Sequence, residues 1–365
     1  MNPGYFIGCD KNELDTPALW VDLDIMERNI TRMAQFMLSA GVNWRPHTKG
    51  IKIPAIAHKL IKAGAIGITC AKLGEAEVMA AAGIHDILIA NQVVGEAKAT
   101  RLANLCHHAD VIVAVDCLDN ARQLSEAACL ASVVIRVVVE VNTGMDRCGV
   151  QPGESALNLA IQLTELPGLQ FSGVMGWEGH TVGIEDPEVK NRCVHQAVEA
   201  LVATAQMIHS TGLAVPIVSC GGSGSYRITA LIPGVTEVQA GGAALGDVTY
   251  TGWGAQTDPG LFILATVISR PAADRAVVDA GRKAMNGEVS MPVVCDFPAL
   301  HLRKLNAEHG ILFIDDPGIR LNVGDKLDFL AGYGDNTVFL HDYLFGVRNG
   351  KVEIAWEVQG RGRLD

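Results

Sequence analysis

Residues 217–226 read Ile-Val-Ser-Cys-Gly-Gly-Ser-Gly-Ser-Tyr, a short apolar run that leads directly into a glycine-rich loop. A second glycine pair, Gly241 and Gly242, follows the next apolar run at residues 237–240. Glycines let backbone N–H groups approach an anion closely, and Ser223 and Ser225 add hydroxyl donors. In a parallel (β/α)8 barrel, the loops after strands seven and eight often bind phosphate. The two loops therefore predict a phosphate site at one end of such a barrel.

The rest of the chain agrees with a barrel, because eight short apolar runs alternate with longer segments of helical periodicity. Eight strand–helix units in a row favour a closed parallel barrel of the TIM type. A doubly wound open sheet is the alternative, but no G-x-G-x-x-G motif follows the first run. The predicted strands cover residues 42–46, 67–71, 87–91, 111–116, 135–142, 171–177, 217–220 and 237–240, and the clearest helices cover 53–63, 73–82, 155–163 and 186–209.

Two parts of the chain lie outside this pattern. Residues 18–22 predict a strand, and a helix is expected over 23–39. After Pro259, strands and turns without long helices predict an antiparallel β domain, which the strand at 18–22 could join. We therefore expect a barrel over residues 26–257 and a β domain from residues 1–25 together with 258–365. The runs that predict its strands are FILATVIS (262–269), RAVVDAG (275–281), MPVVCDF (291–297), GILFIDD (310–316), DKLDFL (325–330), NTVFLHD (336–342) and EIAWEVQG (353–360).

The composition indicates which kinds of molecule the protein can bind. The chain is 49% hydrophobic and carries a formal net charge of -11, which argues against nucleic acid and anionic membranes as partners. Nine cysteines occur without a C-x-x-C pair, so we expect free thiols in a reducing compartment. No run is long and apolar enough for a membrane span, and the first residues do not resemble a secretory signal. A cytoplasmic protein that acts on a small molecule is predicted.

The first predicted strand ends in Arg-Pro-His-Thr-Lys at residues 45–49. A lysine at the barrel mouth, if desolvated, has a lowered pKa and can act as an amine nucleophile. Lys49 is the candidate, whereas Lys52 and Lys59 are expected to be solvated surface residues. A phosphate cradle together with a lysine at the mouth is the arrangement that pyridoxal 5'-phosphate (PLP) requires, because the phosphate anchors it and the lysine binds its aldehyde.

Two further strand ends carry polar side chains. The fifth strand leads into residues 140–149, where Arg147 is placed to face a ligand or to form a surface ion pair with Asp146. The sixth strand ends in Trp177, Glu178, Gly179 and His180. Glu178 and His180 are candidate general bases, although a single histidine is more often structural.

These motifs resemble the fold-type III PLP enzymes, which combine an alanine-racemase-type barrel with a β domain. Within them the chain is most similar to the D-threonine aldolase, D-3-hydroxyaspartate aldolase and D-serine dehydratase family, from TPALWVDLDIMERNI (16–30) to LHDYLFGVRNGKVE (340–353). RPHTK resembles the Schiff-base motif and assigns the PLP lysine to Lys49. NTGMDRCG (142–149) places Arg147 beside the ring, and SCGGSGSY (219–226) and VQAGG (238–242) match the phosphate loops. VVDAGRKA (277–284) opens the β-domain stretch. The implied cofactor contacts are Lys49, His47, Arg147, Trp177, Gly221, Gly222, Ser223, Gly224, Ser225, Tyr226, Gln239, Gly241 and Gly242. A homodimer is also implied.

The chain departs from the family at three positions. Relatives usually hold a divalent metal through a His-x-Asp or His-x-Cys pair, but here Tyr333 replaces the histidine and only Asp335 matches. Because a neutral phenol is a poor metal ligand, Mg²⁺ or Mn²⁺ is expected to bind weakly through Asp335 and waters, or not at all. Ile51 stands where a histidine is common, and Trp177 where a tyrosine is common.

The resemblance implies a lyase that acts on D-configured β-hydroxy-α-amino acids, with His180, Glu178 or Lys49 as the base. Retro-aldol cleavage to glycine and an aldehyde is the leading hypothesis. Dehydration to a 2-oxo acid and ammonia is the first alternative, but it depends more on a Lewis acid. A racemase or epimerase that uses Lys49 and Tyr333 is the second. A PLP-binding protein without turnover is the third, and the predicted β domain argues against it.

Overall fold

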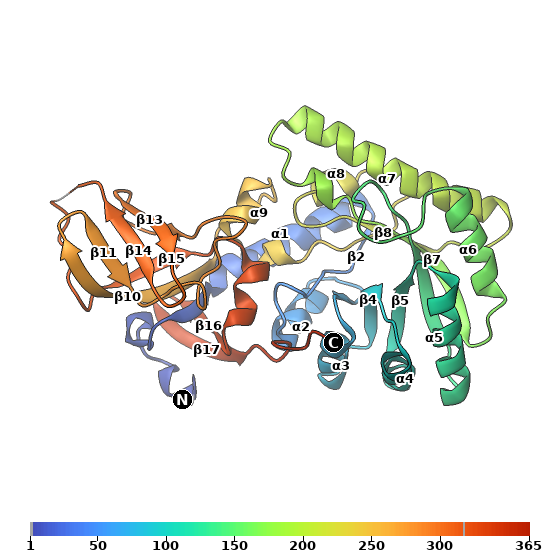
Figure 1. The fold of residues 1–365 in the computed structure, drawn as a ribbon, viewed down its shortest axis with the longest axis horizontal. Helices are drawn as coiled ribbons and strands as arrows, with labels where there is room; N and C mark the ends of the chain where they lie inside the picture. The colour runs from blue at the N-terminus through green and yellow to red at the C-terminus, as the bar shows by residue number, and fades with distance from the viewer. Residues whose placement is uncertain (1–2, 317) are drawn as a thin grey trace.

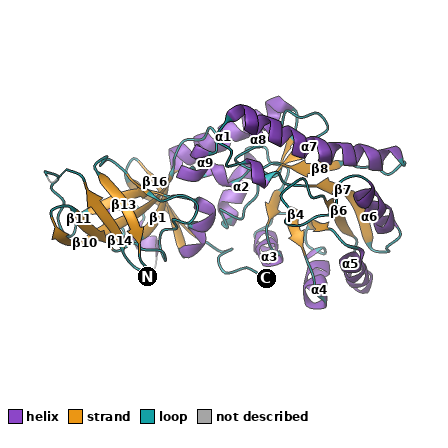
Figure 2. Cartoon of the chain, turned by 45° about the horizontal axis from the view of Figure 1, so that its top comes forward, coloured by secondary structure: helices purple, strands orange, loops and turns teal. Residues whose placement is uncertain are grey.

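The computed structural model describes residues 3–316 and 318–365. The chain forms two lobes side by side (Figure 1). One lobe is a ring of parallel strands enclosed by helices, and the other consists mainly of antiparallel strands. Figure 2 shows this division directly, because most of the helices gather around one set of strands.

The first lobe is a parallel barrel. Its strands follow the order β2-β9-β8-β7-β6-β5-β4-β3 among the described residues. The ring closes between its two end strands, because Ile66 N donates to Trp44 O at 2.9 Å and Thr69 N donates to Pro46 O at 2.9 Å. The predicted barrel is therefore confirmed. Its strands are β2 (Asn43–Trp44), β3 (Ile68–Cys70), β4 (Asp86–Gln92), β5 (Asp110–Val115), β6 (Ile135–Glu140), β7 (Leu169–Met175), β8 (Ile217–Cys220) and β9 (Glu237–Val238).

Helices cover the outside of the barrel, and their starts follow the capping chemistry of the sequence. The longest, α7 (Pro187–Ser210), begins after Asp186, whose carboxylate accepts hydrogen bonds from the N–H groups of Glu188 and Val189. Pro187 fits the first turn because it has no N–H to satisfy there. The remaining helices are α1 (Leu23–Ala40), α2 (Pro54–Lys62), α3 (Leu73–Ala81), α4 (Glu96–Leu105), α5 (Leu118–Ala131), α6 (Glu154–Thr164), α8 (Tyr226–Thr229) and α9 (Val248–Gly252).

The second lobe includes the strand over residues 18–22, which the sequence pattern allowed to join it. β1 (Ala18–Asp22) pairs antiparallel with β10 (Leu261–Ala272) and parallel with β16 (Tyr343–Arg348). Its apolar residues are almost fully buried, with Leu19 and Val21 in one core cluster and Ala18 and Trp20 in another. The other strands of this lobe are β11 (Arg275–Val278), β12 (Val293–Val294), β13 (Leu300–Leu305), β14 (Gly310–Ile314), β15 (Lys326–Leu330) and β17 (Lys351–Glu357).

Three sequence expectations need correction. The run NTVFLHD does not form a strand, because residues 334–340 fold into two 3₁₀ turns, η5 (Gly334–Asn336) and η6 (Val338–Leu340), and Thr337 Oγ1 donates to Tyr333 O at 2.8 Å. The strand β13 was not predicted, because its charged and polar residues mask the alternation. Lys52 is not a solvated lysine, since its side chain is 8% exposed and forms an ion pair with Glu75.

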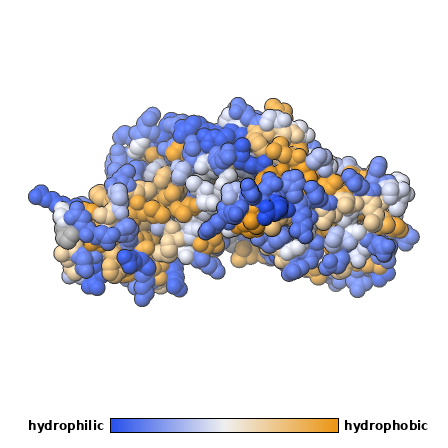
Figure 3. Space-filling view, turned by 90° about the horizontal axis from the view of Figure 1, so that it is seen from above, coloured by the Kyte–Doolittle hydropathy of each residue, from blue (hydrophilic) through white to orange (hydrophobic). Residues whose placement is uncertain are grey.

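The surface agrees with the composition. Figure 3 shows polar side chains over most of the visible face, with apolar ones gathered in small patches. Within the described ranges, none of the helices has the length and apolar character needed to cross a membrane. All nine cysteines are free thiols, as predicted.

Candidate active site

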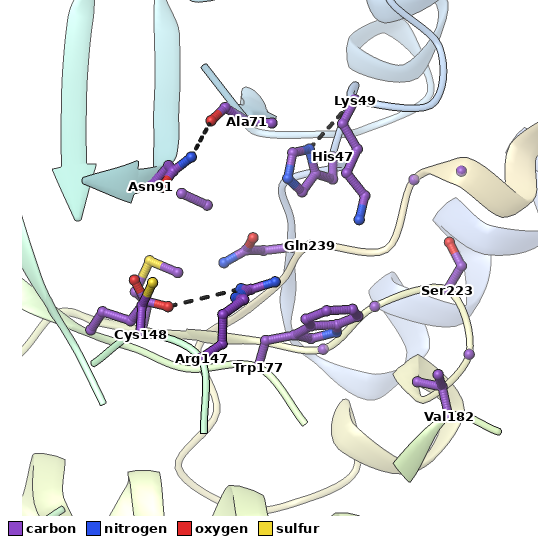
Figure 4. Close-up of a pocket in the computed structure, with 18 of the residues that line it drawn as sticks. His47, Lys49, Ala71, Asn91, Arg147, Cys148, Trp177, Val182, Ser223 and Gln239 are labelled. Atoms are coloured by element: carbon purple, nitrogen blue, oxygen red, sulfur yellow. Dashed lines mark hydrogen bonds and ion pairs between the residues drawn. The ribbon is translucent and has the colours of Figure 1, made fainter. Parts of the chain in front are cut away.

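A cavity of about 250 Å³ opens at the carboxyl ends of the barrel strands. Most residues expected from the sequence to contact the cofactor meet there, and Figure 4 shows several of them directed toward one another. Residues from the second lobe and from α9 close the remaining side. The lining consists of His47, Lys49, Ala71, Ala90, Asn91, Gln92, Glu140, Arg147, Cys148, Met175, Trp177, Val182, Gly221, Gly222, Ser223, Gly224, Gln239, Gly241, Gly242, Tyr250, Trp253 and Tyr333.

Lys49 extends from the turn after β2 into this cavity. The turn is fixed by the preceding residue, because Thr48 N and Thr48 Oγ1 both donate to Thr69 O, at 2.8 and 3.0 Å. The Lys49 ammonium lies 3.4 Å from Asp335 Oδ2 and 5.2 Å from the centre of the Trp177 ring. Its side chain is 36% exposed. The predicted amine is therefore at the barrel mouth and points into the cavity.

The two glycine loops form a set of backbone donors opposite Lys49. Ser223 and Gly224 are buried, and Gly242 is half-buried. The backbone N–H groups of all three have no hydrogen-bond acceptor among the described residues. The loops are tied together because Ala243 N donates to Ser223 Oγ at 3.1 Å. Buried N–H groups are normally paired, so unpaired ones that converge on a cavity indicate an anion site.

The close packing of these loops explains why they contain glycine. A Cβ at Gly222 would lie 2.8 Å from Trp177 Nε1, and one at Gly241 would lie 2.3 Å from the carbonyl oxygen of His47. Neither position has room for a side chain. The backbone itself therefore forms the wall of the anion site, and a phosphate group fits the donors that it presents.

Glu178 lies beneath the first glycine loop and not in the cavity. Its buried carboxylate accepts hydrogen bonds from Ser225 Oγ at 2.7 Å, from Gly221 N at 3.3 Å and from Thr229 Oγ1. Ser225 is therefore directed to Glu178, and Tyr226 donates to Ala255 O at 2.7 Å. Glu178, Ser225 and Tyr226 therefore stabilise the glycine loop from the side that faces away from the cavity. The sequence predicted their side chains at the ligand, and the structure places them on the opposite side of the backbone.

His180 is also outside the cavity. It lies in the 3₁₀ turn η3 (Gly179–Thr181) and is exposed, with its ring beside Gly144. The structure therefore does not bring the two candidate bases, Glu178 and His180, together in the cavity. Of the four residues 177–180, Trp177 lines the cavity and the other three do not.

Arg147 faces the cavity from the loop after β6. Its guanidinium lies 5.3 Å from the centre of the Trp177 ring and 4.0 Å from Glu140 Oε1. The alternative pairing with Asp146 is absent, because Asp146 Oδ1 accepts from Asn142 Nδ2 at 2.8 Å. Burial raises the pKa of Glu140, although the side-chain hydrogen bond from Gln92 opposes this.

The sequence interpretation missed several lining residues. Glu140 is the last residue of β6, and Asn91 and Gln92 end β4. A signal for them was present, because residues at the carboxyl ends of barrel strands face the ligand site. Tyr250 and Trp253 gave no such signal, since they lie on and after the short helix α9, outside the strand–helix repeat.

A group of aromatic side chains and Asp335 closes the cavity on the side of the second lobe. The rings of Tyr250, Trp253 and Tyr333 pack edge to face, with centres 5.4 to 5.8 Å apart. Tyr250 donates its hydroxyl to Asp335 Oδ1 at 2.8 Å, and Tyr333 donates to Asp335 Oδ2 at 3.1 Å. We call Tyr250, Tyr333 and Asp335 the phenol–carboxylate cluster.

Asp247 holds the two tyrosines of this cluster in place. Its Oδ1 accepts from Tyr250 N at 2.7 Å, and its Oδ2 accepts from Gly334 N at 2.6 Å, next to Tyr333. Burial raises the pKa of Asp247 to about 7, although the backbone hydrogen bonds oppose this. One carboxylate therefore links α9 to the turn that follows β15.

The donor set at Asp335 does not fit a divalent cation. Both carboxylate oxygens already accept a phenol hydrogen bond, and the Lys49 ammonium lies 3.4 Å from one of them. Among residues 3–316 and 318–365, no group of three or more histidine, cysteine, aspartate or glutamate side chains could hold a metal ion. Divalent cations in proteins need several such ligands, and a neutral phenol is a weak substitute.

The cavity does fit PLP. Burial lowers the pKa of His47 well below its usual range, and the charges of Lys49 and Lys52 add to this effect, so its ring is neutral near neutral pH. The site thus offers an anion cradle at one end, an amine at the mouth and an indole ring between them. Residues of both predicted phosphate loops take part.

Comparisons with known proteins agree with this geometry. Residues 21–248 match the family model of the alanine racemase N-terminal domain, and residues 260–347 match that of the serine dehydratase domain. D-threonine aldolase from Arthrobacter sp is 37% identical over 96% of this chain and 93% of that protein. 3-Hydroxy-D-aspartate aldolase from Paracoccus denitrificans (strain Pd 1222) is 36% identical over 98% and 94%. The crystal structure of D-threonine aldolase from Filomicrobium marinum superposes with a TM-score of 0.96, at 36% identity, over 98% of this chain and 99% of that one. The chain therefore belongs to the alanine racemase N-terminal domain family and, within it, to the fold-type III PLP enzymes related to the D-threonine and 3-hydroxy-D-aspartate aldolases.

Proposed function

We propose that this protein is a PLP-dependent lyase that cleaves D-configured β-hydroxy-α-amino acids into glycine and an aldehyde. The main support is the position of Lys49, whose amine enters a cavity lined on the opposite side by unpaired backbone donors. The similarity to D-threonine aldolase over 96% of the chain supports the same reaction.

Each end of the cavity has a distinct task in this proposal. The N–H groups of Ser223, Gly224 and Gly242 would hold the cofactor phosphate, and Lys49 would hold the aldehyde carbon. When bound, the cofactor withdraws the electron pair that the broken Cα–Cβ bond leaves on Cα. Trp177, His47 and Gln239 line the space between these ends and would position the ring.

The reaction requires a base near the substrate's β-hydroxyl. As the Cα–Cβ bond breaks, the hydroxyl loses its proton and its oxygen becomes the aldehyde oxygen. Of the three candidate bases, only Lys49 lines the cavity. With PLP and substrate both bound, the Lys49 amine would be the group available to accept this proton. Cα then gains a proton and glycine leaves.

Product analysis on the PLP-reconstituted protein tests the proposal. D-threonine, D-3-hydroxyaspartate and D-serine would be offered separately, and glycine with the matching aldehyde is the expected result. Lys49→Ala should lower turnover by roughly 10²–10⁴-fold, in the range typical of acid–base catalysis. Lys59→Ala is the matched control, because Lys59 lies on α2 and pairs with Glu27 at 3.0 Å, outside the cavity. Absence of glycine from all three substrates would refute the aldolase.

The same experiment identifies the alternatives. A 2-oxo acid with ammonia would indicate a dehydratase. Solvent deuterium at Cα without cleavage would indicate a racemase, a candidate favoured by the position of Tyr333 in the cavity with Lys49. In that case Tyr333→Phe should abolish the α-proton exchange.

Three wider expectations belong to this proposal: a homodimer, a cytoplasmic location, and a division into residues 26–257 and residues 1–25 with 258–365. Sedimentation equilibrium of the holoenzyme checks the first. Limited proteolysis between the two lobes checks the last, because domain boundaries usually lie in exposed segments that few contacts cross.

A further inference from the structure

The phenol–carboxylate cluster lies where the reaction needs a partner for the substrate's β-oxygen. Tyr333 lines the same cavity as Lys49, and both approach one oxygen of Asp335, at 3.1 and 3.4 Å. Asp335 itself is nearly buried, with 8% of its side chain exposed. A hydroxyl is therefore held beside the amine that is the proposed base.

The replacement of the metal-binding histidine by Tyr333 already argues against a divalent cation beside Asp335. The surroundings of Asp335 strengthen this argument. A Cβ at Gly50 would lie 2.1 Å from Asp335 Oδ1, so the carboxylate is packed against backbone on that side. Tyr250, which holds the same oxygen, is 5% exposed and cannot give way to water without loss of packing. The Lys49 amine lies 3.4 Å from the other carboxylate oxygen, Oδ2, which leaves little room for a cation on that side.

We propose that this enzyme binds the substrate's β-oxygen through the Tyr333 hydroxyl, oriented by Asp335 and Tyr250, and works without a divalent cation. This inference rests on the proposed function, because it needs a β-hydroxy substrate. Tyr333 turns its O–H from Asp335 Oδ2 to the β-oxygen, and the β-hydroxyl proton passes to the Lys49 amine. The charge that develops on the β-oxygen is then met by a hydrogen bond, as in an oxyanion hole, and not by a Lewis acid.

The cluster is suited to this task because it is rigid before substrate arrives. Asp335 is held by two phenols, and the backbones of both phenol-bearing segments are held by Asp247. Only the O–H of Tyr333 has to turn when substrate binds, and a phenol oxygen already held in place then stabilises the developing charge without further rearrangement of the backbone. Tyr333 is thus a catalytic residue, and Asp335 is a positioning residue.

The first test separates metal from phenol in the full-length holoenzyme. The protein would be dialysed against EDTA, its metal content measured by mass spectrometry, and D-threonine cleavage followed with and without MnCl₂. Unchanged cleavage by metal-free protein is the expected result. Cleavage that is lost after chelation and restored by MnCl₂ would overturn the inference but leave the aldolase intact. No cleavage under either condition, on any of the three substrates, would instead refute the proposed function.

The second test removes the hydroxyl. Tyr333→Phe should lower kcat on D-threonine by roughly 10²–10³-fold, the usual effect of deleting one oxyanion donor, with cofactor absorbance unchanged. Tyr343→Phe is the matched control, because this phenol lies on β16 and does not line the cavity. Asp335→Asn should lower kcat while leaving KM unchanged, because it misorients Tyr333 without removing a substrate contact. Wild-type kcat in Tyr333→Phe would overturn the inference.

A third measurement is independent of turnover. Calorimetric titration of the holoenzyme with MnCl₂ should show no site that depends on Asp335. Stoichiometric Mn²⁺ binding that disappears in Asp335→Asn would contradict the inference, whatever the activity of the enzyme.

Discussion

Adjacent side chains after β7 point to opposite sides of the backbone, and this separates their tasks. Trp177 lines the cavity, whereas Glu178 is buried beneath the glycine loop and accepts hydrogen bonds from Ser225 and Gly221. Glu178 is the N-cap of the 3₁₀ turn η3, with a ψ angle of 37°, and the backbone turns there so that its side chain leaves the cavity that Trp177 lines. Glu178 therefore supports the anion site as a structural acceptor.

This position predicts the behaviour of Glu178→Gln. One amide oxygen cannot replace two carboxylate oxygens as an acceptor, and the amide N–H₂ would face a donor. We therefore expect the free energy of unfolding to fall by about 1–3 kcal/mol and PLP binding to weaken. At saturating PLP, kcat should stay close to that of the wild type. Denaturant unfolding, PLP titration and steady-state kinetics check the three expectations. A large fall in kcat at saturating PLP would restore Glu178 as a base.

Asp247 predicts a pH dependence of stability. Burial raises its pKa to about 7 in the folded protein, from the usual value of 3.8. Because the folded state holds this proton more tightly, the contribution favours folding at low pH and is lost as the pH rises toward 7 and above. Between pH ~6 and pH ~8 the loss should be about 1 kcal/mol. Asp247→Asn should lack this part of the slope in denaturant unfolding, and an equal slope in both proteins would contradict the assignment.

Single residues also show the limit of what the sequence could predict about the site. Lys49, Arg147 and the glycines were found because they end predicted strands, and the barrel places all strand ends on one face. Tyr333 was identified from the family resemblance, as the replacement for a metal-binding histidine and as a candidate racemase residue. Its ring contact with Tyr250, and the hydrogen bond from Tyr250 to Asp335 across 85 residues, depend on α9 meeting the turn after β15, and no periodicity encodes such contacts.

At the scale of elements, the anion site depends on how closely neighbouring segments approach. The loop after β9 runs against the segment that follows β2, where His47 N donates to Gln239 O at 2.8 Å. Gly241 lies at the closest point. The short strands β2 and β9 thus place Lys49 and the second phosphate loop side by side.

Gly241→Ala should disturb this contact. A new Cβ would lie 2.3 Å from the carbonyl oxygen of His47, so the backbone must move, at a cost of about 1–3 kcal/mol. Weaker PLP binding is expected as well, because the Gly242 N–H shifts with its neighbour. Gly252→Ala on α9 is the control, since nothing lies within 4 Å of its Cβ position. Thermal unfolding and PLP titration of both variants check this expectation.

The elements of the barrel were predicted better than those of the second lobe, and the reason is physical. A strand buried on both faces is a continuous apolar run, such as Ile135–Glu140, and is easily recognised. β13 (Leu300–Leu305) is exposed on one face and carries Lys304 and Arg303, so its pattern is weak. The run NTVFLHD contains three consecutive apolar residues, but these form the 3₁₀ turn η6, in which Val338 is buried and Phe339 is 38% exposed.

At the scale of the whole molecule, β1 connects the N-terminal segment to the strands of the second lobe. Trp20 on β1 stacks on Phe262 with ring centres 4.4 Å apart, and its Nε1 donates to Asp328 Oδ1 at 2.8 Å. The following helix, α1, then continues into the barrel lobe (Figure 1). The second lobe therefore cannot be assembled from the C-terminal part of the chain alone.

Trp20→Ala should destabilise the second lobe strongly. Loss of a buried indole and of its hydrogen bond costs about 3–5 kcal/mol. Because Tyr333 follows β15 in this lobe, PLP-enzyme turnover should fall with stability. Leu38→Ala is the control, since Leu38 is 81% exposed on α1 and its removal should change little. Denaturant unfolding followed by tryptophan fluorescence and by circular dichroism measures the effect.

The position of β1 between β10 and β16 also affects the order in which the chain can fold during synthesis. The strand leaves the ribosome before its partners, because Leu261 and Gly346 emerge hundreds of residues later. At about 5–20 residues per second, β1 waits on the order of ten seconds or more for its first neighbour. During that time the barrel can already close around its own strands. We therefore expect folding in the cell to follow the order of synthesis, with Tyr333 emerging after the barrel that carries Lys49.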